Sequence, residues 1–139
     1  MKVRDVMHTG VEWVTPETPV SVVATKMLER DIGAIPIGEN DRLVGMVTDR
    51  DIAIRAVADG KDVAKLTARD VMTKSVIYCR DVEDLDDAAR LMERRQIRRL
   101  PVIDEDRRMV GILSLGDISH AGSRDLTAEV TQAVSAHHA

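Results

Sequence analysis

The sequence predicts an α/β (α+β) fold built from two copies of one βαββα unit. The main observation is an internal repeat, in which Arg4-Asp5-Val6-Met7 returns as Arg69-Asp70-Val71-Met72, sixty-five residues later. Repeated units of this kind bury their apolar faces on each other. A second observation is that short apolar runs alternate with stretches whose apolar residues lie three and four apart, which is typical of strands and helices in turn.

Length and composition favour one compact protein. The chain has 139 residues, a formal net charge of −4 and no Phe. Each copy, of about 60 residues, is marginal alone, so we expect the copies to share a core. Nucleic-acid binding needs concentrated positive charge, which the sequence lacks, and no apolar stretch has the length of a membrane span. We therefore expect a cytoplasmic protein with no nucleic-acid or membrane partner.

The first copy is expected to run from a strand at 11–14 to a helix at 49–58. Thr18 is placed to cap the first helix, with Pro19 in its first turn. Strands at 34–37 and 43–47 come next, joined by a turn. The apolar residues of the first helix fall at the spacing of a single face: Val20, Val23, Ala24, Met27 and Leu28.

The second copy follows the same order. We expect a strand at 76–79, a helix at 84–95, strands at 99–103 and 109–113, and a short helix from Leu115 that ends near Gly122. Residues 124–139 have no counterpart in the first copy and predict a C-terminal helix whose last residues, 136–139, fray. The predicted domains are therefore 1–66, 67–123 and the tail 124–139.

One local motif occurs in both copies where a strand gives way to a helix. It is Thr48-x-x-Asp51 in the first copy and Ser114-x-x-Asp117 in the second. One interpretation is a capping box, in which the hydroxyl and the carboxylate satisfy free backbone N–H groups. The other is a ligand site, because a helix start suits phosphate and a carboxylate one turn later accepts bonds from ribose hydroxyls. The two interpretations are compatible.

The ordered set of motifs, occurring twice, resembles the CBS domain, named after cystathionine β-synthase. The set is Arg-Asp-Val-Met, then an Ile/Leu-Pro-Ile/Val strand, then Gly-x-x-Thr/Ser-x-x-Asp-Ile, and the resemblance covers residues 1–122. Two such domains in tandem are similar to a CBS pair, or Bateman module, here as a stand-alone protein. The resemblance implies repeats packed about a pseudo-two-fold axis, clefts between them that bind adenosine compounds, and a homodimer.

The resemblance also implies which residues contact that ligand. Thr48 and Asp51 are carried over as phosphate and ribose contacts of one cleft, and Ser114 and Asp117 as those of the other. The residues expected to line the base pockets are Ile35, Pro36, Leu100 and Pro101, with Val11 and Val76 from the first strands.

The copies differ in where their arginines lie. Arg50 lies beside Asp51, whereas the second copy has Arg98 and Arg99 before its Leu-Pro strand. The wider cluster of Arg94, Arg95, Arg98, Arg99, Arg107 and Arg108 is either a phosphate-binding surface or a solvated face paired with the acids of 81–87. Trp13 and Tyr78, at matched positions, either stack on a base, seal the dimer or are half-buried strand residues. We favour the last interpretation.

Catalysis finds little support in the sequence. The four His residues are scattered, and no P-loop, nucleophile elbow or Cys/His metal spacing is present. Cys79 matches Val14 of the first copy and is interpreted as a buried hydrophobe rather than a reactive thiol. We therefore expect no enzyme, no catalytic cofactor and no resident metal. The leading hypothesis is a regulatory module that binds AMP, ADP, ATP, S-adenosylmethionine or NAD, with Mg²⁺ where the ligand carries it, and acts on an unknown protein partner. The alternative is a ligand-free interaction module in which the motifs are only caps.

Overall fold

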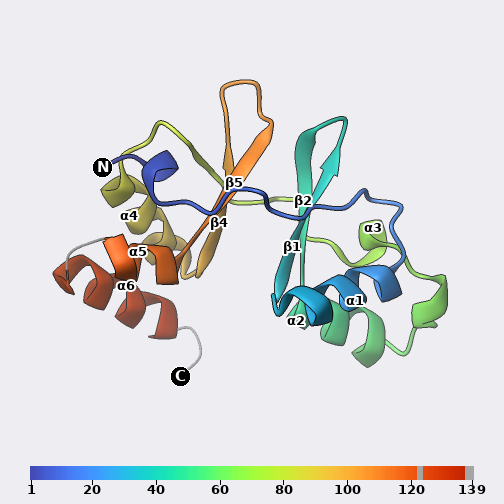
Figure 1. The fold of residues 1–139 in the computed structure, drawn as a ribbon. Helices are drawn as coiled ribbons and strands as arrows, with labels where there is room; N and C mark the ends of the chain where they lie inside the picture. The colour runs from blue at the N-terminus through green and yellow to red at the C-terminus, as the bar shows by residue number, and fades with distance from the viewer. Residues whose placement is uncertain (122–123, 137–139) are drawn as a thin grey trace. The chain divides into compact units, whose positions relative to one another are not determined.

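The computed structural model describes residues 1–121 and 124–136, which fold into two compact units (Figure 1). The first-repeat unit is Glu12–Val76. The second-repeat unit consists of Met1–Val11 together with the chain from Ile77 onward. Each unit is an antiparallel hairpin with helices packed against it, so the predicted α+β class is confirmed.

The first-repeat unit follows the predicted order closely. Its hairpin pairs β1 with β2, and the register shifts between Ile37 and Gly38. The expected helix at 49–58 is continuous, but its second part winds as a π-helix. The elements are α1 (Val20–Arg30), β1 (Ala34–Glu39), β2 (Arg42–Thr48), α2 (Asp49–Ile52), the π-helix η2 (Ala53–Ala58), the 3-10 helix η3 (Val63–Lys65) and α3 (Ala68–Val71).

The second-repeat unit repeats this plan and adds one helix. Its β3 pairs in parallel with β4, which pairs antiparallel with β5. The added helix α6 packs against α4 and α5. The elements are the 3-10 helix η1 (Val3–Asp5), β3 (Cys79–Arg80), α4 (Leu85–Arg95), β4 (Arg99–Ile103), β5 (Met109–Ser114), α5 (Leu115–Ala121) and α6 (Arg124–Ala136).

The compact units cross the boundary between the sequence repeats. The start of the first repeat packs in the second-repeat unit, where His8 and Ile112 exchange backbone hydrogen bonds of 2.9 and 3.0 Å. At the matched place in the first-repeat unit, Thr73 and Met46 exchange bonds of 2.8 and 3.0 Å. Each Arg-Asp-Val-Met segment therefore lies in the unit of the other repeat, where the residue that follows it bonds to the hairpin. The boundaries 1–66 and 67–123 consequently describe the repeats but not the packed units.

The two cores are built from matched residues, some identical and some of different shape. Met27 of α1 and Met92 of α4 are both buried against their sheets. Ile35 and Leu100 occupy the matched strand positions and are fully buried. Each unit thus fills a core of its own without Phe, using branched aliphatic side chains and Met.

Several expectations about local structure are wrong. The strand expected at 11–14 is a single bridge from Val14 to Ile37, and the strand at 76–79 shortens to β3, because the chain passes from one unit to the other just before each. Pro19, not Thr18, precedes α1, and it makes no side-chain cap. The outer end of the predicted apolar face is exposed at Ala24 and Leu28. The predicted helix end at Gly122 and fraying of 137–139 lie outside the described residues.

Burial controls the chemistry of Cys79, which is only 1% exposed. Desolvation, with smaller contributions from Glu83 and Asp81, raises the pKa of its thiol from 9.0 to about 12. We expect Ellman's reagent at about pH 8 to react slowly with the folded protein and rapidly in denaturant, because only the thiolate attacks. Cys79→Val, which has no thiol, is the control for background reaction of the reagent. Equally fast reaction in the folded state would contradict the burial.

The same shift predicts a pH effect on the free energy of unfolding. The folded state holds the thiol proton more tightly than the unfolded state does, so the contribution of Cys79 is complete below about pH 9 and is lost as the pH rises toward 12. Urea titration across this range measures the free energy of unfolding of the wild type and of Cys79→Val. We expect the value for the wild type to fall relative to that for Cys79→Val as the pH rises. A constant difference would exclude the shift.

Two glycines permit the exchanged segments to approach the hairpins. A Cβ on Gly111 would lie 2.6 Å from the backbone oxygen of His8, whereas a Cβ on Gly45 meets first the flexible Met72 Sδ. We expect Gly111→Ala to lower the free energy of unfolding by about 1–3 kcal/mol, and Gly45→Ala by less, because a backbone atom yields less readily than a Met side chain. Gly116→Ala, whose Cβ within α5 would meet Ser114 Oγ at an ordinary contact distance of 3.5 Å, is the control and is expected to be neutral or stabilising. Equal losses for all three in urea unfolding would refute the close approach.

Candidate functional site

In the first-repeat unit, the turn from β2 into α2 forms a complete capping box. The Asp51 amide donates to Thr48 Oγ1 at 3.1 Å, and the Thr48 amide donates to Asp51 Oδ2 at 2.9 Å. Thr48 is extended at the end of β2, so its hydroxyl lies over the first free N–H groups of the helix. The second oxygen, Asp51 Oδ1, lies 3.8 Å from Arg55 Nε, one turn further along.

The second-repeat unit builds the same turn from β5 into α5. The Asp117 amide donates to Ser114 Oγ at 3.1 Å, and the Ser114 amide donates to Asp117 Oδ2 at 2.8 Å. Asp117 is only 8% exposed and is the one buried charged residue among the described side chains. Its second oxygen lies 3.5 Å from Nε2 of His8, which the exchanged segment brings to this edge.

The capping interpretation is thus correct, and the carboxylate half of the box also occurs at two other helix starts. The Thr67 amide donates to Asp70 Oδ2 at 2.8 Å, and the Lys2 amide donates to Asp5 Oδ2 at 2.8 Å. The Asp of each Arg-Asp-Val-Met segment therefore caps its own short helix. A box by itself does not mark a ligand site. What distinguishes Asp51 and Asp117 is a basic side chain, Arg55 or His8, that faces the oxygen left over by the box.

The two edges carry different charges. In the second-repeat unit, Arg99 pairs with Ser114 across the hairpin, and the Arg98 carbonyl accepts from the Leu115 amide at 2.9 Å. Both arginine side chains are exposed beside the turn. In the first-repeat unit, Gly33 and Ala34 take their place, and a Cβ on Gly33 would lie 3.0 Å from Asp49 Oδ2.

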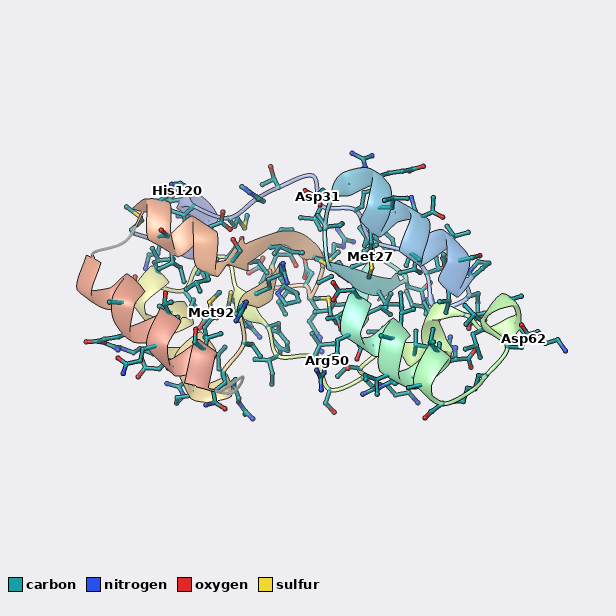
Figure 2. All side chains as sticks on the ribbon, turned by 90° about the horizontal axis from the view of Figure 1, so that it is seen from below. Met27, Asp31, Arg50, Asp62, Met92 and His120 are labelled. Carbon is teal, nitrogen blue, oxygen red and sulfur yellow. The ribbon has the colours of Figure 1, made fainter. Side chains whose placement is uncertain are left out.

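Arg50 is the arginine of the first edge, at the start of α2. Its side chain is exposed, and Figure 2 labels it beside that helix. Its backbone amide donates to Asp49 Oδ1 at 2.9 Å. The first edge therefore offers an arginine from the helix start, and the second edge offers two from the strand start.

The residues expected to line the base pockets belong mainly to β1 and β4. Ile35, Pro36, Leu100 and Pro101 are all buried. Val11 and Val76 are half-buried, each in the unit opposite to its own repeat.

Contacts are defined for some residues of the arginine cluster and of the acids at 81–87. Of the acids at 81–87, Asp84 bonds to Lys2 Nζ at 2.9 Å, and this lysine lowers the pKa of the Asp84 carboxyl. Arg107 lies over the Tyr78 ring, 5.8 Å from its centre.

Trp13 is 41% exposed and packs on Gly38, where a Cβ would lie 2.6 Å from the indole. Trp13 is therefore a partly exposed residue beside the hairpin.

Sequence reasoning missed His8 and Arg55. Arg55 carried a signal, because a residue four places after Asp51 on a helix lies on the same face. His8 also follows the repeated segment directly, in register with Thr73, but its contact with Asp117 depends on the exchange between the units. Within 1–121 and 124–136, the structure holds no group of three or more His, Cys, Asp or Glu able to bind a metal, and no helix there is both long and apolar enough to cross a membrane.

Comparison with known proteins agrees with this architecture. A family model described as "CBS domain" matches residues 3–57 and 68–124. The CBS domain-containing protein YhcV of Bacillus subtilis is 40% identical over 117 residues, which are 84% of this chain and 82% of that protein. Hypoxic response protein 1 of Mycobacterium tuberculosis is 42% identical over 117 residues, 84% of this chain and 81% of that protein.

Solved structures give the same result. A crystal structure of Hypoxic Response Protein I with two coordinated zinc ions is similar at a TM-score of 0.81 and 39% identity, covering 88% of this chain and 100% of that one. CBSX2 in complex with AMP is similar at a TM-score of 0.76 and 31% identity, covering 86% of this chain and 94% of that one. The CBS domain pair of MJ0100 was solved in complex with 5′-methylthioadenosine and S-adenosyl-L-methionine. It is similar at a TM-score of 0.77 and 30% identity, covering 86% of this chain and 94% of that one. The chain therefore belongs to the CBS-domain family and carries two CBS domains in tandem.

Proposed function

We propose that this protein is a regulatory module that binds an adenosine compound at the strand-to-helix edge of each unit. The observation that carries the proposal is the pair of capping carboxylates, Asp51 and Asp117, each with its second oxygen outside the box. Related CBS structures hold AMP, 5′-methylthioadenosine or S-adenosyl-L-methionine, which supports an adenosine ligand here. Binding shifts the population of conformations and so alters the affinity for a partner protein. The role is non-catalytic and cytoplasmic.

The chemistry of each edge suits a nucleotide. The oxygen left over on Asp51 or Asp117 accepts hydrogen bonds from the two ribose hydroxyls. The hydroxyl of Thr48 or Ser114 meets the phosphate, together with Arg50 at the first edge and Arg99 at the second. Mg²⁺ enters only as the counter-ion of a triphosphate. The same proposal includes a homodimer.

The base is expected to lie along the first strand of each hairpin. Ile35 and Pro36 border it in the first-repeat unit, and Leu100 and Pro101 border it in the second. Because the beginnings of the repeats are exchanged, Val76 serves the first-repeat edge and Val11 serves the second.

A ligand-free interaction module is the second candidate. The observation that favours it is the recurrence of the box at Asp5 and Asp70, where it closes helices outside the proposed sites. At the second edge, Leu115 and Gly116 also replace the polar Asp49 and Arg50, so this turn offers fewer polar groups to a ligand.

Calorimetry with a matched control separates the two candidates. Nucleotide-free protein is titrated with AMP, ATP, S-adenosylmethionine and NAD, with and without Mg²⁺. We expect saturable binding of at least one ligand and a loss of about tenfold or more in affinity for Asp51→Ala/Asp117→Ala, since each lost charge-assisted bond is worth about 1.5–3 kcal/mol. Asp51→Ala alone is expected to lower the stoichiometry.

Asp70→Ala is the control. It removes the same backbone-to-carboxylate bond at a turn outside the proposed sites, so it is expected to cost a similar ~1 kcal/mol of stability while leaving the affinity unchanged. Binding that survives the double substitution would refute the site. The absence of saturable binding by any of the ligands would favour the interaction module.

A further inference from the structure

The two edges differ most in the turn that leads into the first strand of each hairpin. Residues 29–34 are Glu-Arg-Asp-Ile-Gly-Ala in the first repeat, and the matched residues 94–99 are Arg-Arg-Gln-Ile-Arg-Arg. The first stretch has two acids and one arginine, a formal charge of −1, whereas the second has four arginines, a formal charge of +4. The backbones are alike, because Asp31 and Gln96 end their helices with φ of 52° and 54°. The two turns therefore present opposite charge on one backbone plan.

The register of each hairpin places this turn beside the hydroxyl of the capping box. Ala34 pairs with Thr48 in the first-repeat unit, and Arg99 pairs with Ser114 in the second. Residues that pair directly across antiparallel strands have their Cβ atoms about 5 Å apart on one face of the sheet. The Thr48 hydroxyl therefore has a methyl group as its cross-strand neighbour, whereas the Ser114 hydroxyl has an arginine side chain.

The residue after each hydroxyl repeats this contrast. The Asp49 amide donates to the Gly33 carbonyl at 2.9 Å, and Asp49 Oδ2 lies 3.0 Å from where a Cβ on Gly33 would stand. In the second-repeat unit, the Leu115 amide makes the same 2.9 Å bond to the Arg98 carbonyl. One backbone contact is thus kept, while a carboxylate beside a glycine is replaced by a leucine beside an arginine.

Most cations of the first edge are held by carboxylates. Arg30 of the turn donates to Glu12 Oε1 at 2.9 Å, and Arg55 Nε lies 3.8 Å from Asp51 Oδ1. Arg50 is exposed at the start of α2 (Figure 2). By contrast, the four arginines of the second turn are all exposed, and none forms an ion pair within the part of the chain that the structure describes. The second edge therefore has an excess of positive charge that attracts anions.

We propose that the two edges select adenosine compounds by the charge of the group on the 5′ carbon. The inference rests on the proposed function, which places that group at the hydroxyl of the box. The second edge prefers nucleotides, because Arg98 and Arg99 attract the 5′ phosphate and form charge-assisted bonds to it. The first edge prefers compounds whose 5′ group is uncharged or positive, such as a thioether or a sulfonium, because Asp49 repels a phosphate there. Asp49 and Arg99 are the specificity-determining residues.

Calorimetry of one edge at a time tests the selection. In nucleotide-free, full-length protein, Asp117→Ala leaves the first edge unchanged and Asp51→Ala leaves the second unchanged. AMP and 5′-methylthioadenosine share adenosine and differ in the charge of the 5′ group. We expect the preference for AMP over 5′-methylthioadenosine to be greater at the second edge than at the first by about tenfold or more. An equal preference at the two edges would overturn the proposal.

The first edge is then altered in charge alone. In Asp117→Ala protein, Asp49→Asn keeps an oxygen for the Arg50 amide and is expected to raise the affinity for AMP about threefold, with that for 5′-methylthioadenosine unchanged. Asp59→Asn is the matched control, because it removes a carboxylate at the far end of the same continuous helix. It is expected to change neither affinity. If both substitutions raise the affinity for AMP equally, the role of Asp49 is wrong.

The second edge is altered in the opposite direction. In Asp51→Ala protein, Arg99→Ala copies Ala34 and is expected to lower the affinity for AMP about tenfold, with that for 5′-methylthioadenosine unchanged. Arg80→Ala is the control, since Arg80 is exposed and pairs with Ile103 at the other end of β4. It is expected to change neither affinity. An equal loss of both ligands in folded Arg99→Ala protein contradicts the assignment of Arg99 to the 5′ group.

The proposed function and the selection fail in different ways. If the wild type binds neither compound saturably, the proposed function fails and the selection fails with it. If the wild type binds both compounds with one preference at both edges, only the selection fails. Circular dichroism shows whether each variant is folded.

Discussion

The exchange of the repeat beginnings is the constraint on which the rest of the structure depends. Each hairpin obtains two backbone hydrogen bonds from a segment of the other repeat, through His8 at Ile112 and through Thr73 at Met46. Gly111 and Gly45 make room for those segments. Neither repeat can therefore complete its unit without the other. The exchange also decides which residues meet, because it is the reason that His8 reaches Asp117 in the second-repeat unit.

In the described part of the chain, four helix starts have the carboxylate half of a capping box, and the two that follow a hairpin strand also have the hydroxyl bond. In all four, a carboxylate oxygen accepts the backbone N–H three residues earlier. The proposed ligand site at Asp51 and Asp117 therefore depends on what surrounds the remaining oxygen. The surroundings differ, since Arg55 approaches from the same helix and His8 from a distant segment. The two edges share one plan, but they present different basic side chains to a ligand.

The sequence predicted the parts of this structure that local pattern determines. The hairpin strands, the two long helices and both boxes follow from apolar spacing and from hydroxyl and carboxylate residues three apart. The strands at 11–14 and 76–79 were overpredicted, because the chain leaves one unit for the other there and only Val14 and β3 are left to pair. Ile35 and Leu100 were expected to line base pockets, and both are fully buried in the cores, on strands that are buried on both faces. Leu28 continues a helical apolar stripe and yet lies outside the core, since periodicity shows which face is apolar but not what covers it.

The segment from Thr48 to Ala58 connects the first capping box to the exchanged Arg-Asp-Val-Met stretch. Its first turn holds the box and Asp51, and the helix continues into η2, which carries Arg55. Arg55 lies near Asp51 Oδ1 and also donates to the Met72 carbonyl at 2.9 Å, so it ties this segment to the exchanged stretch. A ligand that competed for Asp51 Oδ1 would therefore act on Arg55 and, through it, on the Met72 contact. In the second-repeat unit, α5 packs against α6 and Asp117 faces His8, so a ligand there would act on the exchanged segment directly. The divergence of the repeats thus gives the proposed ligand a different structural consequence in each unit.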